Sequence, residues 1–254
     1  VSRTGIIPLS SSFDAPGVLA RNPEILREVF LSMIGVDPAD DQSFELRSKE
    51  SKPSRKRIIL CVNRSLGEME LLQTKLRSFL AQLKLNGFEI IFIDLPEVSF
   101  DYKTISSTDI RADITKFLHR YGPDNEPRSF EGLVECYRER PHAHLYGMER
   151  LEDALAMPQI EKSELKKLVQ ENVAKARNLI NSILDRYDAD FVGFLNFVDW
   201  FSIGGGPSST LPVSFETKPP ISIMLGSRLG NDLALLDIVQ EFSEVAKAAQ
   251  HTDN

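Results

Sequence analysis

Three consecutive serines, Ser10, Ser11 and Ser12, stand two positions before Asp14 and form the cluster that first suggests chemistry. A serine hydroxyl becomes a nucleophile when a base lies within hydrogen-bond reach and donors face the developing oxyanion. Asp14 is a weak base for this purpose, because an ordinary carboxylate has a pKa of about 4, far below that of a hydroxyl. Serine and aspartate ahead of a helix also form turns and side-chain bonds to the backbone. The residue types favour a structural loop, with a nucleophile as the alternative.

Two other clusters contain versatile residues without the groups that their chemistry needs. His142 and His144 would share one face of an extended segment, as a metal pair does, but Pro141 indicates a surface loop and no third ligand is suitably spaced. The glycine-rich run over residues 204–209 resembles a phosphate cradle, yet Pro207 removes a backbone donor and a strand pattern follows instead of a helix. No Gly-x-Ser-x-Gly nucleophile elbow occurs either. We expect no metal and no cofactor.

The elements that would position these residues begin with a helix and a βαβ unit. Residues 22–35 predict a helix with Asn22 as its N-cap. Continuous apolar runs over residues 57–63 and 88–95 predict two buried strands. The amphipathic segment over residues 66–86 predicts the helix between them, so the two strands are expected to be parallel with a right-handed crossover.

The second half of the chain adds more helices and strands. Helical patterns cover residues 106–120, 129–139, 147–155, 162–186 and 231–250, and β-like runs cover residues 189–196, 209–215 and 221–227. The fold class is therefore α/β, with a central mixed β-sheet covered by helices. We treat residues 1–254 as a single domain with a flexible linker at about residues 40–56.

Composition excludes several classes of function. The net charge of −7 and the pI of about 5.3 argue against a nucleic-acid-binding face, and the basic run over residues 49–57 is typical of a solvated linker. No apolar stretch approaches the ~18 residues that a membrane span needs. Cys61 and Cys136 give no disulfide framework, so we expect a reducing cytoplasm.

Residues 2–21 read SRTGIIPLSSSFDAPGVLAR. This stretch resembles the segment of amidase-signature hydrolases that follows their nucleophile, with the pattern S-R-x-G-x-x-P-x-x-x-S-x-D-x-x-G-P-x-A-R. Residues 37–40, Asp-Pro-Ala-Asp, stand where the family has D-P-x-D, and Val18 replaces the usual proline.

Weaker similarities to the same family continue in order to the end of the chain. They lie at residues 129–134, 146–151 (near Y-G-Q-x-x-L), 206–213 (near G-x-P-x-x-x-x-P), 220–227 (near G-L-P-V-G-L-Q-L-I-G) and 232–236. The resemblance implies an amidase-signature α/β/α sandwich and hydrolysis of a carbon–nitrogen amide bond in a small amide substrate.

The same resemblance places the family's Ser–Ser–Lys triad upstream of the S-R-x-G motif. None of Ser10, Ser11, Ser12, Ser208 or Ser209 matches a catalytic position. We therefore expect a C-terminal scaffold and substrate-pocket portion of an amidase that is inactive alone. The alternatives are a non-catalytic structural or binding subunit of the same fold, and an unrelated α/β domain that binds a small ligand at its strand ends.

The resemblance also singles out Asp14 and Arg21 as structural positions beside the catalytic loop. Asp14 is expected to accept backbone N–H bonds, and Arg21 to pair with a carboxylate or bind carbonyls; a local cap and a surface ion pair are the simpler alternatives. A portion of this fold would expose a sheet edge and an apolar face. We expect it to form homo-oligomers or to associate with an N-terminal part, and to bind neither nucleic acid nor membrane.

Overall fold

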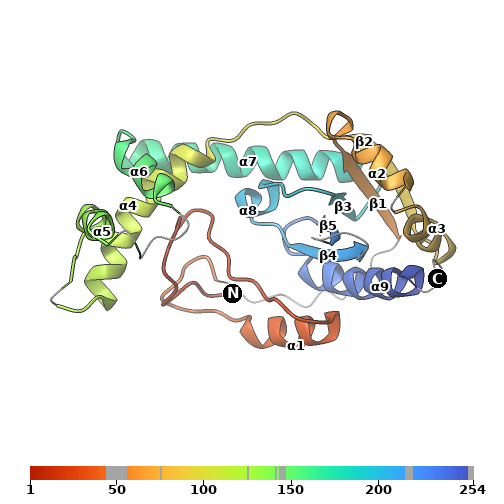
Figure 1. Cartoon of the computed structure of the whole chain (residues 1–254), viewed down its shortest axis with the longest axis horizontal. Coiled ribbons are helices and arrows are strands. Elements are labelled where there is room, and N and C mark those ends of the chain that lie inside the picture. The colour runs from red at the N-terminus through yellow and green to blue at the C-terminus, as the bar shows by residue number, and fades with distance from the viewer. Residues whose placement is uncertain are drawn as a thin grey trace.

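The structure is a computed structural model, shown in Figure 1, which describes residues 1–43, 56–74, 76–124, 126–140, 142, 147–214 and 220–250. The helices within these residues are α1 (Pro23–Met33), α2 (Glu68–Thr74), α3 (Arg77–Leu85), α4 (Tyr102–Tyr121), α5 (Phe130–Arg138), α6 (Glu149–Ala156), α7 (Lys162–Arg186), α8 (Trp200–Gly204) and α9 (Asp232–Gln250), with a 3-10 helix η1 (Arg64–Leu66). The strands are β1 (Arg57–Val62), β2 (Glu89–Asp94), β3 (Phe191–Phe194), β4 (Ser208–Ser214) and β5 (Ile221–Gly226).

The strands form one mixed sheet with the order β2-β1-β3-β5-β4. Strand β1 is parallel to both β2 and β3, and β5 is antiparallel to both β3 and β4. The predicted class, α/β with a central mixed sheet covered by helices, is confirmed.

Helices cover both faces of this sheet (Figure 1). On one face, alternate side chains of β1 pack with α2, α3 and α9, in a core where the ring of Phe242 meets that of Phe79 edge to face at 5.1 Å. On the other face, Ile59 and Cys61 pack against α7 and α8. A strand covered on both faces needs apolar side chains at successive positions, which explains the uninterrupted apolar run of β1.

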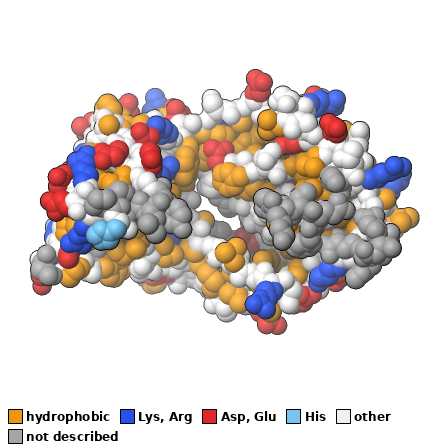
Figure 2. Space-filling model, viewed as in Figure 1, with side chains coloured by type: hydrophobic (Ala, Val, Ile, Leu, Met, Phe, Trp, Pro, Cys, Tyr) orange, Lys and Arg blue, Asp and Glu red, His pale blue; other side chains and the backbone are white. Residues whose placement is uncertain are grey.

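A second core lies beyond the end of the sheet. Helices α4, α5 and α6 pack around Ile110, Ile114, Phe130, Val134 and Ala154. The 25-residue helix α7 extends from this helical cluster to the sheet (Figure 1). The face seen in Figure 2 is hollowed between the two parts, with hydrophobic side chains beside the hollow.

Two predicted elements differ from the structure. Strand β2 is not buried: its side chains are exposed or half-buried, and Phe92 is 38% exposed, because β2 is an edge strand of the sheet. The helix predicted over residues 66–86 is divided into η1, α2 and α3, and Gly67 ends η1 in the left-handed region with φ 70°.

Three further differences concern bounds and coverage. Helix α4 begins at Tyr102, four residues before the predicted start, and α8 was not expected from the sequence. Residues 44–55, most of the predicted linker, lie outside the described residues.

Candidate functional site

The serine loop, residues 9–14, is held on α4 by two buried carboxylates. Ser10 is fully buried, and its hydroxyl donates to the carboxylate of Asp109 at 2.6 Å. The backbone N–H of Ser12 donates to the same oxygen at 3.2 Å, and the N–H of Ser11 donates to Asp113 at 2.8 Å. Each bond anchors the loop, so the structural interpretation of the serines is supported by their contacts.

The two predicted structural positions have different surroundings. Asp14 accepts backbone N–H bonds from Leu9 at 2.8 Å and Ser10 at 2.9 Å, which closes the serine loop on itself. Arg21 is exposed, and no ion pair joins it to another described residue. The structure therefore brings Asp14 into the loop that α4 holds, and leaves Arg21 at the surface.

The S-R-x-G segment binds the D-P-x-D loop directly. Asp40 accepts bonds from the backbone N–H of Arg3 at 2.8 Å, from its Nε at 3.0 Å and from its terminal nitrogen at 2.5 Å. These bonds hold the pKa of the Asp40 carboxyl well below its usual range. Asp37 similarly accepts the hydroxyls of Ser2 and Thr4. The S-R-x-G and D-P-x-D motifs thus bind each other in the folded protein.

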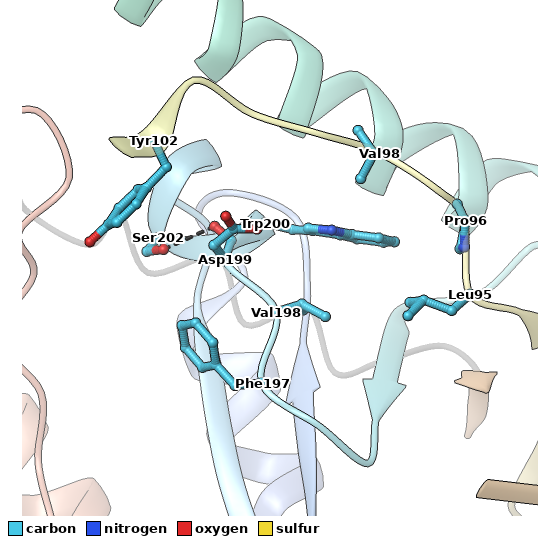
Figure 3. A pocket seen from close by; sticks show the side chains of 9 residues that line it. All are labelled: Leu95, Pro96, Val98, Tyr102, Phe197, Val198, Asp199, Trp200 and Ser202. Carbon is cyan, nitrogen blue, oxygen red and sulfur yellow. Dashed lines mark hydrogen bonds between the residues drawn. The ribbon is translucent and has the colours of Figure 1, made fainter. Parts of the chain in front are cut away.

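A pocket of about 420 Å³ lies where the chain leaves β2 and β3 (Figure 3). The connection from β2 to α4 supplies Leu95, Pro96, Val98 and Tyr102, and the connection from β3 with α8 supplies Phe197, Val198, Asp199, Trp200 and Ser202. Both strands are parallel to β1, so their carboxyl ends meet at one edge of the sheet. Ligands of open α/β sheets bind at this edge, and an apolar cleft with few polar groups is the usual form of a small-molecule site.

Asp199 is the polar centre of this pocket. Its backbone carbonyl accepts the Ser202 hydroxyl at 2.9 Å, and its carboxylate makes no capping bond to α8. Burial raises the pKa of the Asp199 carboxyl. Beside it, Trp200 is buried and packs edge to face on Phe194 at 5.0 Å.

Helix α7 holds both walls of the pocket. The amide of Asn172 accepts the backbone N–H of Asp101 at 2.9 Å and donates to its carboxylate at 3.1 Å, next to Tyr102. Arg177 donates from Nε to the carbonyl of Gly204, the last residue of α8, at 2.7 Å.

The serine loop also reaches the pocket. Phe13 stacks on Tyr102 with ring centroids 5.7 Å apart and an interplanar angle of 19°. The Tyr102 ring also meets the guanidinium of Arg150 at 5.7 Å. The loop that resembles the family motif therefore supports one wall of the pocket.

Sequence reasoning missed most of these residues. Asp199 and Tyr102 follow the predicted strands 189–196 and 88–95 by a few positions. Ligands of open α/β sheets bind at the carboxyl ends of the strands, so this position could have indicated both residues. Asp109 and Asp113 are four residues apart on α4, and their spacing places both carboxylates on one face of the helix.

The part of the chain that the structure describes includes His142 and the glycine run over residues 204–209. Among the described residues, no group of three or more histidines, cysteines or acids is placed to hold a metal ion; His144 lies outside them. The glycine run ends α8 and leads into β4, as predicted, rather than into the start of a helix. None of the described helices is both long and apolar enough to cross a membrane.

The model of the Amidase family matches residues 1–192, and the chain therefore belongs to the Amidase family. A glutamyl-tRNA(Gln) amidotransferase subunit of Orientia tsutsugamushi (strain Boryong) is 27% identical over 248 residues, which cover 90% of this chain and 47% of that protein.

Solved structures show the same fold. An amidase family protein from Bacillus anthracis str. Ames has a TM-score of 0.81 at 20% identity, covering 97% of this chain and 51% of its own. Native peptide amidase from Stenotrophomonas maltophilia has a TM-score of 0.77 at 18% identity, covering 97% and 56%. The chain spans about half the length of these proteins.

Proposed function

We propose that this chain is the scaffold and substrate-pocket part of an amide hydrolase, which cleaves a carbon–nitrogen bond of a small amide other than a peptide bond. The observation that carries this proposal is the pocket at the carboxyl ends of β2 and β3 in a chain of the Amidase family. Seven of the nine residues that line it are apolar or aromatic, as is common in sites for small organic substrates.

The pocket residues contribute binding and orientation. Hydrolysis adds water across the amide and yields a carboxylic acid and an amine, and it needs a nucleophile, a base and donors for the oxyanion. The serines of the serine loop are poorly suited to this role, because the Ser10 hydroxyl is buried against Asp109 and already donates to it. In the family, the nucleophile, the bridging serine and the lysine belong to the signature segment. The motifs of this chain do not match that segment.

The test compares two preparations on a simple aryl amide. We expect no turnover above buffer from the 254-residue chain, and turnover from the protein expressed from its complete coding sequence. In the active preparation, Phe197→Ala removes a pocket side chain that is 80% exposed and should raise KM several-fold. Leu19→Ala, which removes a fully exposed side chain that does not line the pocket, is the matched control.

Either of two results would overturn the proposal. If the complete protein hydrolyses none of a panel of aryl and alkyl amides, the chain is a binding or structural subunit. If the 254-residue chain alone turns amides over and Ser10→Ala abolishes the reaction, the chemistry lies in the serine loop.

A further inference from the structure

Among the nine residues that line the pocket, Asp199 is the only one whose side chain is charged at neutral pH. Its carboxylate makes no capping bond to α8, and no ion pair joins it to another described residue. A carboxylate that is partly withdrawn from water without a counter-ion is unfavourable until a cation or a strong donor approaches it.

Cations on the neighbouring elements are engaged elsewhere. Lys175 of α7 donates to the carbonyl of Ser99 at 2.7 Å and lies over the ring of Phe100. Arg64, after β1, pairs with Asp94 at the end of β2. Neither of these side chains lines the pocket, and neither does Arg150, which lies over the ring of Tyr102. No cationic side chain therefore lines the pocket beside Asp199.

Three aromatic side chains are grouped around this carboxylate. In Figure 3, Tyr102 and Phe197 lie to one side of Asp199 and the indole of Trp200 extends on the other. The faces of aromatic rings attract organic cations, most strongly where water is excluded. A carboxylate among aromatic rings repels an anion, and a neutral ligand would leave its charge without a partner.

We infer that the pocket binds an organic cation, a protonated amine carried on an apolar or aromatic group, with the ammonium paired to Asp199 and the organic part against Trp200 and Phe197. This inference rests on the proposed function only in identifying the ligand with the substrate, which would then be an amide that carries a protonated amino group.

Trp200 makes the binding measurable without any turnover, because it is the single tryptophan of the chain. The 254-residue chain is titrated at neutral pH with benzylammonium and with benzyl alcohol, a neutral ligand of similar shape, while tryptophan fluorescence is recorded. We expect a saturable change with benzylammonium and an affinity at least about tenfold weaker for benzyl alcohol.

Asp199→Asn should abolish this preference, so that the two ligands bind equally weakly. Burial raises the pKa of the Asp199 carboxyl, so the neutral asparagine suits the folded state and the variant should keep its circular dichroism spectrum and melting temperature. Asp124→Asn is the matched control, since the Asp124 side chain is fully exposed on the surface and does not line the pocket.

Equal affinity of the wild-type chain for the two ligands would overturn the inference, as would an unchanged preference in a folded Asp199→Asn variant. These outcomes are separate from those for the proposed function. If the complete protein hydrolyses neutral amides and the chain shows no cation preference, only the inference about the cation is wrong. If the chain prefers benzylammonium and the complete protein is inactive, only the proposed function is wrong.

Discussion

The adjacent serines Ser10 and Ser11 should differ sharply when each is replaced by alanine. The Ser10 hydroxyl is fully buried and donates to Asp109 at 2.6 Å, whereas Ser11 contributes through its backbone N–H, which alanine retains. A hydrogen bond to a charged group contributes about 1.5–3 kcal/mol. Because Asp109 keeps its bond from the N–H of Ser12, we expect Ser10→Ala to lower the free energy of unfolding by about 2 kcal/mol.

For a protein of this size, a loss of about 2 kcal/mol lowers Tm by about 4–8 °C. The assay is urea unfolding followed in parallel by circular dichroism and by Trp200 fluorescence, whose coincidence tests two-state behaviour. Ser11→Ala is the matched control and should stay within about 0.5 kcal/mol of the wild type.

Two results would refute this reasoning. If Ser10→Ala and Ser11→Ala cost the same, the buried hydroxyl has no special role. If Ser10→Ala changes the free energy of unfolding by less than about 0.5 kcal/mol, the bond to Asp109 does not anchor the loop.

Two further stability predictions follow from other contacts. Asp40→Asn weakens the contact with Arg3 and should lower the free energy of unfolding by about 2 kcal/mol at pH 7. Because the folded protein lowers the pKa of Asp40, that contribution is present above the unfolded pKa of about 3.9 and is lost as pH falls toward the folded value. The variant and the wild type should therefore have equal denaturant midpoints only in strong acid, and a difference in midpoint that does not depend on pH would contradict the ion pair. Gly226→Ala would place a Cβ 2.2 Å from the buried ring of Phe201 and should cost at least about 2 kcal/mol in the same unfolding assay, whereas Gly17→Ala has nothing within 4 Å; equal effects would show that the sheet yields at no cost.

Local patterns predicted several elements to within one residue. Helix α7 has the predicted bounds, residues 162–186, and β1 and β5 differ from prediction by one residue, because each carries an uninterrupted pattern over its whole length. The five-residue helix α8 was missed because it is shorter than two helical turns and ends in a glycine run that favours a loop.

The exposure of β2 could not be predicted from its own residues. Its apolar run resembles that of β1, but an edge strand differs from a central strand only in the number of its neighbours, which is a property of the whole sheet.

The site was predictable only in part. The motif over residues 2–21 identified the serine loop and the backbone bonds of Asp14, because both are local in sequence. The pocket is formed by Tyr102 together with residues 197–202, and the sequence of neither segment indicates that the two lie close together. Only the pairing of β2 and β3 on either side of β1 brings them together.

The attachment of both pocket walls to helix α7 bears on how the pocket selects ligands. Asn172 and Arg177, which hold the two walls, are five residues apart on one rigid helix, or about 7.5 Å along its axis. The helix therefore sets the distance between the walls, because each wall is bonded to the helix separately. Such a pocket selects ligands by width, because it binds those that match the distance between its walls and does not widen for larger ones.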